Sequence, residues 1–184
     1  MTIPAARVLN RLSTFRRPAI RTGQYYDATT AHSGVAATAS AMTANRLYAI
    51  PIFLEKPTPI DRIALNVTVG AAGNLRFGAY RALAKSFAPG SLIIDAGEVT
   101  AVGAALKQAT TVAVLPAGFS WLTVVSDVTP TVTQLGSQTS LLGGDAGSCY
   151  GHVYMAHTYG ALPATFSASP TYASTGPRLW ARAA

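Results

Sequence analysis

The side chains that could perform acid–base or metal chemistry are few and widely spaced. The chain has seven acids and three histidines, and Asp95 and Glu98 are three residues apart around a predicted turn. Glycoside hydrolysis needs two carboxylates that face each other across the scissile bond, so we interpret this pair as turn or loop charges. A pair assembled from distant strands is left open. His152 and His157 are five residues apart, which would place them on opposite faces of a strand and argues against a shared metal ion.

Other motifs for chemistry are missing from the sequence. Cys149 is the single cysteine, which excludes an intrachain disulfide or a cysteine-based zinc site and favours a small buried side chain. The glycine-rich segment 143–147 lacks the Lys-Ser/Thr that follows in a phosphate-binding loop. We therefore predict no catalytic residues, no metal and no cofactor, and a protein that builds or binds rather than an enzyme.

One aromatic group is a candidate surface for a ligand or a partner protein. Tyrosine combines an apolar ring with a polar hydroxyl, which suits glycan stacking and protein interfaces. Near the glycine-rich segment, tyrosines alternate with histidines, and the alternative interpretation is that these rings fill one end of the fold. The candidate residues are Tyr150, His152, Tyr154, His157 and Tyr159.

The elements that must position these residues are short strands. Apolar runs separated by Gly, Pro, Asn and Asp recur every 8–12 residues along the chain, which is typical of a sandwich or barrel. Residues 61–69 and 75–80 both alternate, and the Gly73-Asn74 turn between them predicts a hairpin. In the run 119–125, Phe119, Trp121, Thr123 and Val125 share a face, so Trp121 is expected in the core. The predicted fold is all-β, an antiparallel, jelly-roll-like β-sandwich over residues 22–184.

A basic arm, residues 1–21, precedes the sandwich. The net charge is +7, and five arginines precede the first acid, Asp27; removing them leaves nine Lys and Arg against seven acids. An arm of this kind can contact an acidic protein surface, anionic lipid or nucleic acid, and it also has the composition of a transit peptide. No membrane insertion is expected, because Pro116 and Gly118 break the longest apolar stretch. The arginines are Arg7, Arg11, Arg16, Arg17 and Arg21.

Four segments between residues 21 and 127 form a recognisable succession: RTGQYYD at 21–27, NRLYAIPIFLEKPTPIDRIALNVTVGAAGNLRFGAY at 45–80, PGSLIIDAGEV at 89–99 and LPAGFSWLTVVSD at 115–127. In these segments, residues 21–127 resemble virion proteins of tailed bacteriophages and gene transfer agents. The resemblance implies a structural or receptor-binding protein of a virion, such as a tail fibre, head spike or decoration. It also implies an N-terminal anchor, a homo-oligomer with a trimer favoured, and no catalytic residues. The last third of the chain is outside it.

Low charge content agrees with an assembled protein. Only 11% of residues are charged, against about a quarter in typical soluble proteins. We expect the arm to bind other virion proteins, with a host-surface glycan as a candidate ligand and nucleic acid disfavoured. The alternatives are a free carbohydrate-binding module and, less favoured, a glycan-degrading enzyme.

Overall fold

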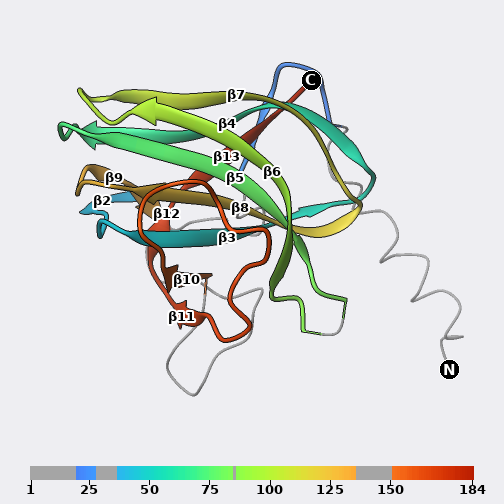
Figure 1. Ribbon diagram of the computed structural model, residues 1–184. Coiled ribbons are helices and arrows are strands. Elements are labelled where there is room, and N and C mark those ends of the chain that lie inside the picture. Colours follow the sequence, from blue (N-terminus) through green and yellow to red (C-terminus); the bar gives the residue numbers. More distant parts are fainter. Residues whose placement is uncertain (1–19, 28–36, 85, 136–150) are drawn as a thin grey trace, which may run out of the picture.

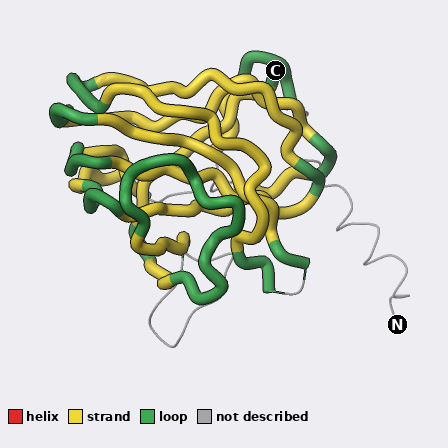
Figure 2. The backbone as a smooth tube through the Cα atoms, viewed as in Figure 1, coloured by secondary structure: helices red, strands yellow, loops and turns green. Residues whose placement is uncertain are grey.

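A computed structural model describes residues 20–27, 37–84, 86–135 and 151–184. Two antiparallel sheets pack face to face, and Figure 1 and Figure 2 show them as two layers of strands. The described residues contain no helix, so the predicted antiparallel β-sandwich is confirmed.

The strands divide into a seven-stranded and a six-stranded sheet. The seven-stranded sheet contains β1 (Tyr25–Asp27), β2 (Ala37–Ala41), β4 (Thr58–Val69), β7 (Ala105–Leu115), β9 (Thr131–Leu135), β12 (Gly176–Pro177) and β13 (Leu179–Ala183). The six-stranded sheet contains β3 (Arg46–Leu54), β5 (Asn74–Ala82), β6 (Pro89–Thr100), β8 (Gly118–Ser126), β10 (His152–Ala156) and β11 (Thr171–Ala173).

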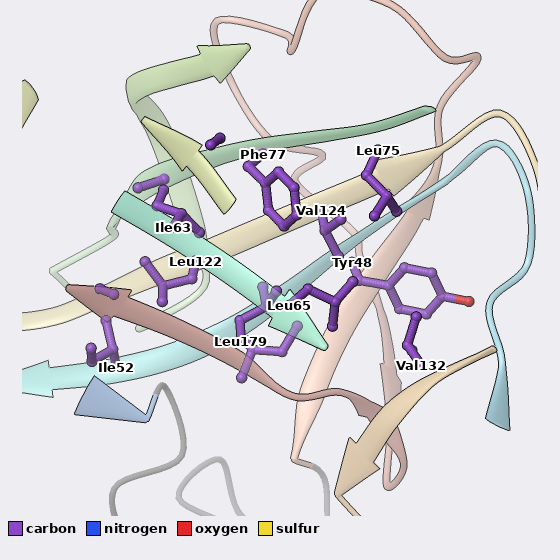
Figure 3. Packing of buried hydrophobic residues seen from close by; sticks show 14 of the residues in the cluster. Tyr48, Ile52, Ile63, Leu65, Leu75, Phe77, Leu122, Val124, Val132 and Leu179 are labelled. Atoms are coloured by element: carbon purple, nitrogen blue, oxygen red, sulfur yellow. The ribbon is translucent and has the colours of Figure 1, made fainter. Parts of the chain in front are cut away.

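The main core lies between the two sheets. Alternation along β4 turns Ile63, Leu65 and Val67 inward, where each is at most 1% exposed. Leu75 and Phe77 of β5 meet them from the six-stranded sheet, and Figure 3 shows these side chains interdigitating. Burial of this apolar surface is the main force holding the sheets together.

The predicted hairpin of residues 61–69 and 75–80 is wrong. β4 pairs with β7, β9 and β13, whereas β5 pairs with β6 and β8, so residues 70–73 carry the chain from one sheet to the other. The crossing is tight: a Cβ at Gly70 would lie 2.1 Å from the Gly103 nitrogen, and one at Gly73 would lie 2.5 Å from an Asp127 carboxylate oxygen. Glycines and Asn74 are compatible both with a hairpin turn and with a connection that crosses between the sheets. Their presence in the sequence therefore does not distinguish these two structures.

A second apolar cluster covers the outer face of the six-stranded sheet. Residues 157–166, which we call the strap, run across this face (Figure 1). Leu162 and Phe166 of the strap pack on Trp121 and Tyr80. Trp121 is 1% exposed, so its predicted place in a core is confirmed, and that core lies beneath the strap rather than between the sheets.

Asp95 and Glu98 do not lie in a turn, contrary to our interpretation. They belong to β6, which runs without a break from Pro89 to Thr100. Pairing with β5 shifts between Asp95 and Gly97, and Gly97 has a φ of +82°. An inserted residue with glycine at positive φ is the geometry of a β-bulge, and the sequence signal for this bulge resembles that of a turn.

Candidate functional site

Two members of the predicted aromatic group share one face of β10. His152 and Tyr154 alternate along the strand, and Tyr48 of β3 is the register partner of Tyr154. Ring centroids are 5.9 Å apart for Tyr48 and His152, and 6.2 Å apart for Tyr154 with either ring. The Arg46 guanidinium lies 4.2 Å from the Tyr154 ring centroid, close enough for a cation–π interaction.

His152 fills space inside the fold. Its side chain is 2% exposed, and a Cβ at Gly176 would lie 2.6 Å from its Nδ1 atom. Burial, and secondarily the charge of Arg46, lowers the pKa of His152 to about 4, so the ring is neutral at neutral pH. His152 therefore agrees with the alternative interpretation, in which the rings fill one end of the sandwich.

His157 and Tyr159 lie beyond the end of β10, at the start of the strap. Asn45 holds both backbones: its carbonyl oxygen accepts the His157 N–H at 2.9 Å, and its Oδ1 accepts the Tyr159 N–H at 2.8 Å. Asn45 itself has a φ of +56°, a conformation that asparagine tolerates better than most residues. The start of the strap is therefore fixed by one asparagine.

The middle of the strap is held by a polar network on the outer face of β5 and β6. Asp95 accepts hydrogen bonds from Arg76 Nε at 2.9 Å and from the Leu162 N–H at 3.0 Å. The Tyr159 hydroxyl donates to Glu98 Oε2 at 2.9 Å, and Arg76 Nη1 lies 4.0 Å from the same oxygen. Burial and this bond raise the pKa of Tyr159. Both carboxylates thus hold the strap in place.

The predicted aromatic group is divided by the fold. His152 and Tyr154 lie with Tyr48, whereas Tyr159 reaches β6 at the other edge of the six-stranded sheet. Tyr150 lies outside the described residues, as do four of the five arm arginines: Arg7, Arg11, Arg16 and Arg17. Arg21 is described and exposed, and its backbone N–H donates to the Tyr26 hydroxyl at 2.5 Å.

An exposed aromatic group that was not predicted from the sequence lies at the loop between β5 and β6. Phe87 packs edge-on against Phe119, with centroids 5.6 Å apart, and Phe119 packs in the same way against Phe53 at 5.1 Å. Phe87 is 53% exposed and Leu83 is 46% exposed. We call these four residues the phenylalanine tip. A usable signal was present, since two large apolar residues occupy a short loop that otherwise contains small and polar residues.

The backbone of Phe87 is held in an unfavourable conformation. Its φ is +55°, which is uncommon for a bulky residue and carries strain. The Trp121 indole N–H donates to the Phe87 carbonyl at 2.9 Å, and the Phe87 N–H donates to the Leu83 carbonyl at 2.9 Å. A strained backbone conformation persists only where the surrounding contacts hold it in place. Residues with strained backbones occur often at functional sites.

Comparisons with known proteins place the chain in no family: no family model and no curated protein matches its sequence. Within the described ranges, no three His, Cys, Asp or Glu side chains are grouped so that they could share a metal ion. The same part of the chain contains no helix long and apolar enough to cross a bilayer.

Proposed function

We propose that the protein is an oligomeric structural component of a phage-like particle. The basic arm, residues 1–21, attaches it to other proteins of the particle, and the sandwich projects from that anchor.

The distribution of charge carries this proposal. Among the described residues after the arm, three arginines form ion pairs within the sandwich: Arg76 with Asp95, Arg178 with Asp27, and Arg182 with Asp61. The sandwich thus uses much of its small charge internally. The arm, by contrast, holds five arginines and no acid, and such a segment favours an acidic partner.

An exposed edge strand supports assembly of several copies. Within the described strands, β7 pairs only with β4, so its other edge has unpaired backbone groups. Val112 is 92% exposed and Val114 is 56% exposed on this strand. An apolar edge with little charge is a liability in a monomer, and a neighbouring copy would cover it.

The test is incorporation into particles. Particles are purified from the host on a density gradient, and the chain is quantified by mass spectrometry relative to the most abundant particle protein. We expect the unmodified chain in the particle fraction and strong depletion of R16A/R17A, because attraction between the arm and an acidic surface is lost. R16K/R17K, which keeps both positive charges of the arm, serves as the control and should incorporate normally.

Two results would contradict the proposal. Absence of the unmodified chain from every particle fraction would remove the assignment to a particle. Normal incorporation of a soluble, folded R16A/R17A variant would remove the anchoring role of the arm.

A further inference from the structure

The phenylalanine tip lies at the end of the sandwich from which the arm departs. The Gly23 N–H donates to the Ala183 carbonyl, and the Ala184 N–H donates to the Pro59 carbonyl. Pro59 pairs with Val114 near the end of β7, two residues before the turn that leads into β8. The second residue of β8 is Phe119, which contacts Phe87. A continuous series of contacts therefore connects the arm exit with the tip.

The opposite end of the sandwich is formed by other connections. It contains the crossing at residues 70–73, where the Ala101 N–H donates to the Gly73 carbonyl, and the turn that joins β6 to β7. Figure 2 shows that the loop between β5 and β6 projects away from the sandwich and from the turns gathered at that opposite end. The Phe87 and Leu83 side chains of the tip are exposed, so a partner can reach them.

Exposed basic side chains lie at the same end of the sandwich as the tip and the arm exit. Arg21, Lys56 and Arg81 are exposed at this end, and Glu55 is the one exposed acid described there. Arg81 precedes Leu83 by two residues, and Lys56 lies in the turn after Phe53. An apolar group with basic residues at the same end is complementary to an apolar recess bordered by acidic residues.

The tip is already ordered for binding. Phe119, Phe53 and the bond from Trp121 to the Phe87 carbonyl hold the ring and its backbone in place. A rigid aromatic side chain loses little conformational entropy on association, which is why such residues often dominate binding energy.

We propose that the phenylalanine tip is a docking site, with Phe87 and Leu83 seated in an apolar recess on an acidic protein of the particle. This inference rests on the proposed function and names a second contact for the same attachment. The arm supplies attraction over distance, and the tip supplies the short-range fit that sets the orientation of the sandwich.

The first test compares incorporation of Phe87→Ser and Leu83→Ser with that of Val102→Ser. Val102 is 57% exposed and lies in the turn between β6 and β7, at the opposite end, so its substitution removes a similar apolar surface. We expect about tenfold fewer copies per particle for Phe87→Ser, as for loss of an interface anchor, a smaller loss for Leu83→Ser, and no change for Val102→Ser. Phe87→Trp, which retains a large ring, should retain incorporation.

The second test identifies what the tip touches. A photo-crosslinking phenylalanine analogue replaces Phe87 in the full chain, intact particles are irradiated, and the crosslinked peptide is sequenced. A crosslink to another protein of the particle, at a segment with net negative charge, supports the proposal. A crosslink to a second copy of this chain, to lipid or to no partner would overturn it.

The outcomes separate this inference from the proposed function. If the unmodified chain incorporates and R16A/R17A is depleted while Phe87→Ser incorporates normally, the arm anchors the chain and the tip does not dock. If the unmodified chain is absent from particles, the proposed function fails first, and the tip has no particle protein to bind.

Discussion

At the scale of single residues, burial decides what a side chain does. His152 and Tyr159 were grouped by type and spacing, yet the fold buries the first against Gly176 and uses the second to bond Glu98. Neither outcome is encoded locally, because Gly176 and Glu98 come from distant parts of the chain. A pattern of tyrosines and histidines therefore predicted an aromatic cluster but not which rings would remain exposed.

His152 should make the protein sensitive to mild acid. The pKa of His152 is about 4 in the folded state and about 6.5 in an exposed histidine. The unfolded chain therefore binds the proton at a higher pH than the folded chain, and the free energy of unfolding should fall by about 3 kcal/mol as the pH drops through this window. Urea unfolding at a series of pH values between about 4 and 6.5 measures this change in the free energy of unfolding.

Two substitutions test whether His152 is the group responsible. Arg46, Tyr48 and Tyr154 face this ring, and His152→Phe keeps an aromatic ring among them without a titrating group. Stability of this variant should be nearly flat across the window, whereas His157→Phe should lose stability as the unmodified chain does. An unchanged acid loss in His152→Phe would assign the effect to other groups.

At the scale of elements, the strap acts as a third layer although it is not a regular element. Its apolar residues close the outer face of the six-stranded sheet, and the Tyr80 hydroxyl donates to the Pro163 carbonyl at 2.8 Å. Irregular backbone leaves polar groups that need partners. The side chains of Asn45 and Asp95 accept the Tyr159 and Leu162 N–H groups, and Glu98 accepts the Tyr159 hydroxyl.

Asp95→Ala should loosen the strap more than it perturbs the sandwich. The substitution leaves the Leu162 N–H without its partner and Arg76 with only the more distant Glu98 carboxylate. Loss of one member of a partly buried pair costs about 2–4 kcal/mol. Hydrogen exchange should accelerate in residues 160–166 before it does so in β8. Glu98→Gln, at a more exposed position, should cost less than about 1 kcal/mol. Equal protection of the strap in Asp95→Ala would contradict this role.

Strand positions were predictable from local pattern, but strand pairing was not. Alternation located β4, β5 and β8, because the period of two is set by the backbone alone. The predicted inward faces of β4 and β5 are correct, whereas the predicted core face of β8, which includes Trp121, lies under the strap. β5 could pair with β4 or face it across the core. The choice depends on two segments that come later in the chain: β8, which pairs with β5, and the strap, which covers its outer face. The irregular strap has no period and left no comparable signal.

At the scale of the whole molecule, composition predicts the class of fold. It does not predict the phenylalanine tip. Frequent turn residues and scarce charge indicated a sandwich, which the two sheets confirm. The tip depends on two strands, β3 and β8, and on one loop, which meet only after folding. Its strained residue follows from the contacts of Trp121, a residue that local pattern could assign only to a core.

Assembly should depend on the exposed edge at β7. Val112→Lys places a charge on the edge where the proposed neighbouring copy would pack, so it should convert the oligomer to monomer in sedimentation analysis. Val69→Lys, at a 60% exposed position on β4, is the matched control and should leave the sedimentation coefficient unchanged. A monomeric unmodified chain at micromolar concentration would contradict the proposed oligomer.

The pairing of β1 with β13 has a mechanical consequence. The arm leads into β1, and β1 lies antiparallel to β13, with Tyr25 opposite Arg182 and Asp27 opposite Trp180. If the arm is held and the sandwich is pulled away, the load runs along the strands, so that the hydrogen bonds between them bear it together in shear rather than opening one by one. A short attachment placed in this orientation resists a pull better than its length suggests.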